Sequence, residues 1–161
     1  MQKLKILNTK ERKELLKKIN NQWDCDFKTD LVFLLSSKEK IYLANRENLD
    51  FQQEHQKSLR IDALGLYFAE IKKGFFRLSI EGSQLIGPLA KKNILEVDQE
   101  TMKHWLRGND LEDVKGDYSD FVIISSKNKT AGKIDYCGTG KYSENKIINY
   151  VPKARRILSK D

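Results

Sequence analysis

The chain has 161 residues, of which 39% are hydrophobic, so it can bury a core in one domain or two small ones and is not expected to be disordered. Its formal net charge is +7 at pH 7. No stretch approaches the roughly 20 consecutive apolar residues that span a bilayer, and lysines interrupt the opening MQKLKILNTKERKELL, where a secretory signal needs an apolar run. We therefore expect a soluble, intracellular, cytoplasmic protein.

The first predicted elements are a helix and a hairpin. Apolar residues recur at helical spacing after Thr9, which predicts an amphipathic helix over residues 10–22 with Thr9 as its N-cap. The runs LVFLL (31–35) and IYLAN (41–45) flank the polar SSKEK and predict two strands joined by a short turn. The polar segment 48–57 is compatible with a second helix.

A second hairpin leads to a predicted domain junction. ALGLYFAEI and GFFRLSI are separated by KKG, which places Gly74 at a turn between two strands. The following EGSQLIGPLAKK contains two glycines and Pro88, the first proline of the chain. We predict the junction here, between a domain of residues 1–88 and one of residues 89–161.

The second half of the chain is predicted to consist mostly of β-strands. A short strand is predicted over residues 94–97, and Asp98 then caps a helix that ends at Gly108. Glycine, asparagine and lysine turns separate the β-type runs that follow, at residues 121–125, 130–136 and 146–151. This spacing predicts a small, mostly β barrel.

The residues that most often carry chemistry are isolated in this sequence. Cys25 and Cys137 lie far apart and outside any CxxC pattern, so we interpret them as small core residues. His55 and His104 lack the spacing that would bring them to one metal ion. We predict no metal site, no cofactor and no catalytic residue.

The GTGK segment at residues 138–141 superficially resembles a phosphate-binding loop. A Walker A motif needs a glycine at position 135, which is Asp here, and Ser or Thr at position 142, which is Tyr. We interpret Gly138 and Gly140 as turn residues that need positive φ or let the backbone approach a partner closely.

Charge is segregated along the second half. Residues 94–120 contain three basic and eight acidic residues, a net of −5, whereas residues 121–160 contain nine basic and two acidic residues, a net of +7. A basic region of this kind is typical of a site for a polyanion, and we favour nucleic acid over a merely solvated face.

Several short motifs follow one another across most of the chain. They are the LG step at Leu64 and Gly65, Phe68, the FRL triplet at 76–78, the LA pair at 89–90, HWLRGNDL (104–111) and AGKID (131–135). Their order and spacing give the chain a resemblance to the Nip-seven family of ribosome-biogenesis factors. It implies an α+β protein in which an N-terminal α/β pre-PUA domain precedes a small, mostly β PUA-type pseudo-barrel. It also implies that the N-terminal half packs against and docks proteins.

The C-terminal end shows a second resemblance. GK followed by a glycine turn and NYVPKARR is similar to the end of the PUA-like domain attached to some RNA cytosine-C5 methyltransferases. The chain has no Pro-Cys dipeptide and no glycine-rich methyl-donor loop. The resemblance therefore implies the RNA-binding part without the enzyme.

The resemblance to PUA domains implies that RNA contacts the first helix of the barrel and the closing strands. Lysine supplies a mobile charge for phosphate, and arginine can bind phosphate in bidentate fashion or stack on a base. The candidate RNA-binding residues are Lys103, Arg107, Lys133, Lys141, Lys146, Lys153, Arg155 and Arg156. Tyr136, Tyr142 and Tyr150 could stack on bases, although barrel packing is the favoured interpretation.

These features predict a non-catalytic RNA-binding protein that acts in ribosomal RNA maturation or ribosome assembly, with rRNA, a precursor or tRNA as partner. With roughly five phosphate contacts, doubling the salt should weaken binding about tenfold. The alternative is an RNA-binding accessory component of tRNA or rRNA modification. A third hypothesis is a protein adaptor that binds no RNA.

Overall fold

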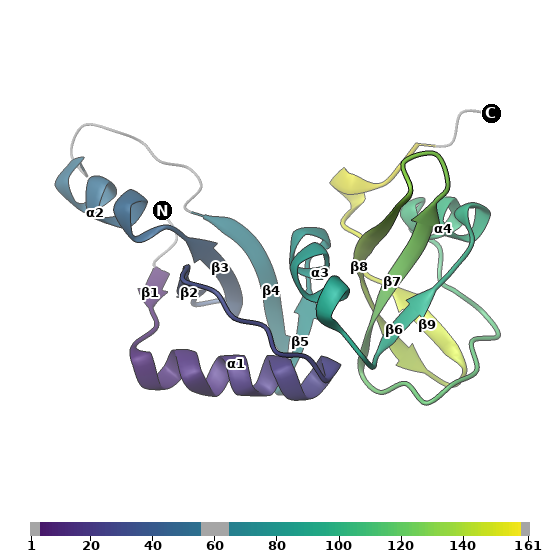
Figure 1. The fold of residues 1–161 in the computed structure, drawn as a ribbon, viewed down its shortest axis with the longest axis horizontal. Coiled ribbons are helices and arrows are strands. Elements are labelled where there is room, and N and C mark those ends of the chain that lie inside the picture. The colour runs from purple at the N-terminus through teal and green to yellow at the C-terminus, as the bar shows by residue number, and fades with distance from the viewer. Residues whose placement is uncertain (1–3, 56–64, 159–161) are drawn as a thin grey trace.

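The computed structural model describes residues 4–55 and 65–158, which form two β-sheets with helices packed around them (Figure 1). The first sheet is antiparallel, in the order β1-β2-β3-β4-β5. Its strands are β1 (Leu4–Ile6), β2 (Val32–Ser36), β3 (Lys40–Ala44), β4 (Leu66–Lys72) and β5 (Phe75–Leu78).

The second sheet has the order β6-β7-β8-β9, with β6 parallel to β7 and the other pairs antiparallel. Its strands are β6 (Ile94–Glu96), β7 (Phe121–Asn128), β8 (Lys133–Ser143) and β9 (Lys146–Asn149). The helices of the described residues are α1 (Thr9–Trp23), α2 (Arg46–His55), α3 (Ile80–Ile86), α4 (Gln99–Leu106) and the short 3₁₀ segments η1 (Gly87–Leu89) and η2 (Lys153–Arg155).

The predicted α+β fold, an α/β N-terminal region followed by a β-rich C-terminal region, is confirmed. Helix α1 matches the predicted helix, but its N-cap is Asn8, and Thr9 is already helical. The Asn8 side chain accepts a hydrogen bond from the Glu11 amide, and the Glu11 carboxylate accepts one from the Asn8 amide. This reciprocal capping box satisfies two amide donors, which a threonine one residue later cannot do.

The predicted elements and the observed ones also differ elsewhere in the N-terminal half. Strand β1 was not predicted because three residues carry too little alternation to signal a strand. The predicted second helix corresponds to α2, and positions 56, 57, 63 and 64 of the predicted elements lie outside the described residues.

The segment predicted as an interdomain junction is a helix followed by a 3₁₀ turn. Ser79 caps α3 by accepting a hydrogen bond from the Gly82 amide at 2.9 Å. A Cβ at Gly82 would lie 2.1 Å from the Phe68 carbonyl oxygen, so only glycine lets α3 approach β4 this closely. Gly82, read from the sequence as a breaker, is therefore a close-packing residue.

The two sheets share a hydrophobic core. Phe68 and Phe76 of the first sheet lie in the same buried cluster as Phe121 and Ile123 of the second. Across the junction, the Thr139 hydroxyl donates to the Leu78 carbonyl at 3.0 Å. The predicted division into residues 1–88 and 89–161 falls between the sheets and stays a prediction.

A second core lies beneath α4. Trp105 is fully buried there with Val122 and Ile147, and its indole Nε1 donates to the Cys137 carbonyl oxygen at 2.8 Å. Trp105 thus fixes the inner face of α4 on β8 and leaves the opposite face of the helix to solvent. Among the described helices, none is long and apolar enough to cross a membrane.

Candidate nucleic-acid interface

The strand lysines among the predicted RNA-binding residues are spread over the second sheet. Lys133 begins β8, and Lys141 lies eight residues further along the same strand. At about 3.3 Å per residue, their Cα atoms are about 26 Å apart. Figure 1 shows the tip of the β7–β8 hairpin and β9, which begins at Lys146, at opposite ends of the sheet.

Two of these lysines are paired with carboxylates from the acidic segment that precedes them. Lys141 Nζ lies 2.9 Å from an oxygen of Asp120. Lys146 Nζ lies 3.6 Å from Asp110 and 3.9 Å from Glu112. The two lysine side chains are only partly exposed. The carboxylates therefore offset positive charge that, from the sequence alone, is expected to be available to a ligand.

The acidic segment reaches β9 because its backbone pairs with that strand. Leu111 and Ile147 form an isolated antiparallel bridge, with both N–H to carbonyl distances at 2.9 Å. The Val114 amide also donates to the Asn145 carbonyl at 2.7 Å. The segment of net −5 therefore lies against part of the segment of net +7, and charge segregation in sequence is partly cancelled in space.

Four of the remaining cations lie in the last turn of α4 or in the C-terminal segment that contacts it. We define the α4–η2 patch as Lys103, Arg107, Lys153 and Arg156. Arg107 caps α4 with its amide donating to the Lys103 carbonyl, so the two residues are one turn apart, as predicted. A Cβ on Gly108 would lie 2.4 Å from Nε of Arg156, so the Arg156 side chain lies directly over Gly108.

A backbone hydrogen bond holds the residues after η2 against this end of α4, because the Ile157 amide donates to the Leu106 carbonyl at 3.0 Å. Within the C-terminal segment, Nε of Arg156 donates to the Val151 carbonyl at 3.0 Å. Within the described ranges, Arg107, Lys153 and Arg156 of the patch form no ion pair, and Lys103 has one exposed pair with Glu100 at 3.4 Å. Exposed pairs of this kind contribute little, so the patch keeps most of its positive charge.

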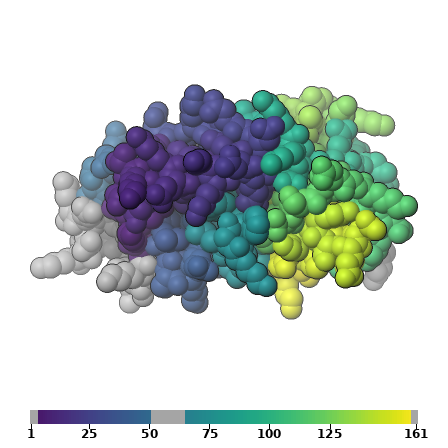
Figure 2. All heavy atoms as spheres, turned by 90° about the horizontal axis from the view of Figure 1, so that it is seen from below, coloured from purple at the N-terminus to yellow at the C-terminus, as the bar shows by residue number. Residues whose placement is uncertain are grey.

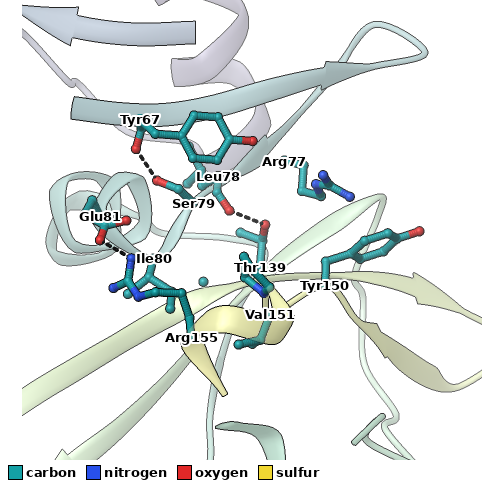
Figure 3. Close-up of a pocket in the computed structure, with 12 residues that line it drawn as sticks. Tyr67, Arg77, Leu78, Ser79, Ile80, Glu81, Thr139, Tyr150, Val151 and Arg155 are labelled. Atoms are coloured by element: carbon teal, nitrogen blue, oxygen red, sulfur yellow. Dashed lines mark hydrogen bonds and ion pairs between the residues drawn. The ribbon is translucent and has the colours of Figure 1, made fainter. Parts of the chain in front are cut away.

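Arg155, although adjacent to the patch in sequence, turns the other way. Its guanidinium pairs with Glu81 of α3 at 2.6 Å (Figure 3). Both residues line a hollow between the two halves of the chain. The hollow is also lined by Tyr67, Arg77, Ser79, Thr139 and Tyr150.

A second hollow adjoins the first and shares Arg77 and Tyr150 with it. We call the two together the junction groove. The second hollow is lined in addition by Lys72, Lys73, Phe75, Asp120, Phe121 and Lys141. Figure 2 shows residues of β4 and β5, in teal, next to those of the C-terminal segment, in yellow, on one face of the molecule.

Arg77 is fixed at the centre of the groove. Its guanidinium carbon lies 4.6 Å from the centroid of the Tyr150 ring, and the side chain is also paired with the buried carboxylate of Glu70 (Figure 3 shows Arg77 above Tyr150). Burial by itself raises the pKa of Glu70, but the hydrogen bond from Lys72 and the charge of Arg77 outweigh it and leave this pKa below its ordinary value. Glu70 is therefore a charged anchor beneath the groove.

The sequence did not single out the N-terminal side of this groove. The signal was present in KKGFFR (72–77), where cations alternate with aromatic residues around a turn. It was interpreted only as a hairpin because its neighbours from β8 and β9 are distant in sequence. Tyr150 was named as a possible stacking residue, and the structure leaves its ring partly exposed.

Gly138 has the positive φ that was predicted, at 83°, but neither Gly138 nor Gly140 lies in a turn, because both are buried inside β8. The Gly138 amide donates to the Ser83 hydroxyl at 2.8 Å. A Cβ on Gly140 would lie 2.5 Å from the Trp105 ring, so this glycine makes room for the indole. The Gly138 amide is therefore not free to bind a phosphate.

Tyr136 and Tyr142 are packing residues, as the favoured interpretation predicted. The Tyr136 ring lies against Gly87, and the Tyr142 hydroxyl donates to the Val114 carbonyl at 3.2 Å. Cys137 packs beside the core under α4, and burial raises the pKa of its thiol to about 11. The described residues contain no group of three His, Cys, Asp or Glu side chains that could hold a metal ion.

Comparison with known protein families bears on the same region. The family described as "Methyltransferase RsmF PUA domain" matches residues 92–157, which include the second sheet, α4 and η2. This part of the chain is therefore a PUA domain of the RsmF type. A search of curated proteins found no match to the chain.

A PUA domain is an RNA-binding domain, so the match points to RNA binding. It agrees with the predicted PUA-type C-terminal half and with its resemblance to the PUA-like domain of a methyltransferase. Membership of the Nip-seven family stays a prediction. The α4–η2 patch lies within the matched residues, whereas the junction groove is formed jointly with residues that precede them.

Proposed function

We propose that this protein is a non-catalytic RNA-binding protein that acts in ribosomal RNA maturation or ribosome assembly and contacts RNA through the α4–η2 patch. The observation that carries the proposal is the PUA domain at residues 92–157. The patch supports it because Arg107 and Lys153 project from the surface of that domain without an ion-pair partner among the described residues. Arginine and lysine in this setting can bind phosphate.

The ion pairs lower the expected number of phosphate contacts. Four available cations, rather than five or more, give a slope of about −2.8 in log affinity against log salt for single-stranded RNA. Doubling the salt should then weaken binding about sevenfold. Lys133 could add a contact only for an RNA that reaches the tip of the β7–β8 hairpin.

The test is an anisotropy titration with structured and U-rich RNAs at two salt concentrations. Arg107→Gln combined with Lys153→Gln removes two exposed charges with no intramolecular ion pair among the described residues, whereas truncating Arg155 or Arg156 also breaks internal contacts. The matched control, Lys13→Gln with Lys38→Gln, removes two exposed charges from the N-terminal half. We expect weaker binding for the first pair alone, and equal affinities for both pairs would overturn the role of the patch.

The ribosomal role is tested separately by crosslinking the protein in its native cells and sequencing the attached RNA. Recovery of rRNA or its precursors supports the proposal. Recovery of tRNA alone contradicts it. If the anisotropy titration also detects no RNA binding at the lower salt concentration, the protein adaptor is favoured.

The second candidate is an accessory component of RNA modification. The observation behind it is the description of the matching family, which names a methyltransferase. In this role the chain would deliver RNA to a separate enzyme. Calorimetry with S-adenosylmethionine distinguishes both non-catalytic roles from a methyltransferase, since only the enzyme should bind this methyl donor.

A further inference from the structure

The junction groove gathers exposed aromatic rings. Among the large hydrophobic side chains that the described part of the chain exposes, the aromatic ones are Phe75 and Tyr150, each 40% exposed. Both line the second hollow of the groove, although one comes from β5 and the other follows β9. Exposed aromatic rings are costly to leave in water, and their meeting in one groove indicates a surface that is covered by a ligand.

The rings are connected through a third aromatic residue and a lysine. The centroid of Phe121 lies 6.0 Å from that of Tyr150, with the rings edge to face. Nζ of Lys141 lies 5.4 Å from the Phe121 centroid and 5.9 Å from the Phe75 centroid. Phe75 and Tyr150 are therefore linked through Lys141 and the buried Phe121 ring, and the ring surface that is open to solvent in the groove is that of Phe75 and Tyr150.

Charge complementarity favours an anionic occupant. Five cations and two carboxylates line the two hollows, a net of +3. The buried Glu70 behind them reduces the local net to +2. Lys73, at the β4–β5 turn, has no ion pair among the described residues, and Lys72 and Arg77 retain free N–H donors beside their carboxylate partner.

We infer that the junction groove binds a single-stranded segment of RNA, with an unstacked base against Phe75 and Tyr150 and phosphates at Lys73 and Lys72. Stacking platforms bordered by cations are how proteins bind single strands without reading a fixed sequence, because every base has a π face. This inference rests on the proposed function, since Tyr150 and Lys141 belong to the PUA domain. It extends the RNA path across the domain junction, away from the α4–η2 patch.

The experiment measures anisotropy of a labelled oligouridylate and of a duplex RNA with the full-length chain. Phe75→Ala should weaken binding of the single strand about tenfold, because stacking on one aromatic side chain supplies that order of affinity. Duplex binding should not change, since paired bases are already stacked. The control is Ile134→Ala, which removes an apolar side chain of similar exposure, 43% against 40% for Phe75, near the start of β8.

The outcomes separate this inference from the proposed function. If Arg107→Gln with Lys153→Gln weakens RNA binding and Phe75→Ala behaves like Ile134→Ala, the groove is overturned and the proposed function stands. If the unmodified chain binds neither RNA, both fail. If an acidic peptide displaces the oligouridylate from the unmodified chain but not from Phe75→Ala, the groove is a protein-docking site and the RNA assignment is overturned.

Photocrosslinking provides a second measurement that does not depend on a variant folding. An oligonucleotide containing 4-thiouridine should crosslink to the peptides that contain Phe75 or Tyr150. Crosslinks confined to α4 and η2 would overturn the inference.

Tyr150→Phe keeps the ring and should bind as the unmodified chain does, whereas Tyr150→Leu should lose affinity.

Discussion

The cations at the end of α4 and those on β8 and β9 have different surroundings, although all belong to the same PUA domain. Arg107 and Lys153 form no ion pair among the described residues, whereas Lys141 and Lys146 are paired with Asp120, Asp110 and Glu112. The difference arises because the acidic segment pairs with β9 through Leu111 and leaves α4 and η2 uncovered. A count of charges along a sequence therefore does not give the charge of a surface.

The largest expected effect comes from removing the Trp105 side chain, which packs the helix that carries Lys103 against the strand that carries Lys141. Trp105 joins α4 to β8, and Trp105→Ala should lower the free energy of unfolding by about 3–5 kcal/mol, because it leaves a cavity and an unpaired Cys137 carbonyl. Urea denaturation measures this. Lys103→Ala, on the exposed side of the same helix, should change stability by no more than about 0.5 kcal/mol. Equal effects would contradict the division of α4 into a buried and a solvent face.

The next effect compares the two sets of cations directly. Arg107→Gln with Lys153→Gln should reduce the salt slope of RNA binding by about 1.4 units, from two lost phosphate contacts. Lys141→Gln with Lys146→Gln should reduce it by less, because carboxylates already offset these charges. The measurement is a titration at several salt concentrations. A larger loss from the strand pair would reverse the comparison.

A smaller effect should follow from freeing a paired cation. Asp110→Asn combined with Glu112→Gln removes both partners of Lys146 while keeping side chains of similar size. If the released lysine meets a phosphate, the salt slope should steepen by about 0.7 units. Asp113→Asn with Asp117→Asn, two exposed residues of the acidic segment that form no ion pair among the described residues, is the charge control. The same steepening in this control would attribute the effect to net charge rather than to Lys146.

The smallest expected effect concerns the buried carboxylate of Glu70, which pairs with two cations of the first sheet. The pKa of Glu70 lies below its ordinary value in the folded protein, so its pairs with Arg77 and Lys72 stabilise the fold above about pH 4.5, and this contribution is lost as the pH falls through the lowered pKa. Glu70→Gln should be less stable than the parent chain at neutral pH, and the difference should shrink below pH 4.5. Denaturation curves across this range check it. A difference that does not vary with pH would show that Glu70 acts by packing.

Local sequence patterns predicted most of the elements. The apolar spacing of α1, the KKG turn before β5 and the Asp98 cap of α4 are each formed by residues a few positions apart, so a sequence shows them directly. Helix α3 was missed because Gly82 and the nearby Pro88 of η1 signal a loop. Gly82 is instead needed for contact with β4, which is a tertiary requirement.

The candidate site was less predictable than the fold. The turn from Lys103 to Arg107 follows from helical periodicity, and both residues lie on the patch. The ion pairs that offset Lys141 and Lys146 join positions that only the pairing of Leu111 with β9 brings together. Gly138 and Gly140 were misassigned because the length of β8 depends on its partners β7 and β9, not on its own composition.

By itself, the sequence determined the order of most helices and strands, the basic character of the C-terminal quarter and a PUA-type second half, in which residues 92–157 match the PUA family. Only the tertiary structure decided which of its cations face solvent without a carboxylate and that Phe75 and Tyr150 line one groove. The physical reason is that helix and strand signals depend on neighbours along the chain. Electrostatic pairing and π surfaces depend on distances of a few ångströms between residues that the fold brings together from distant parts of the chain.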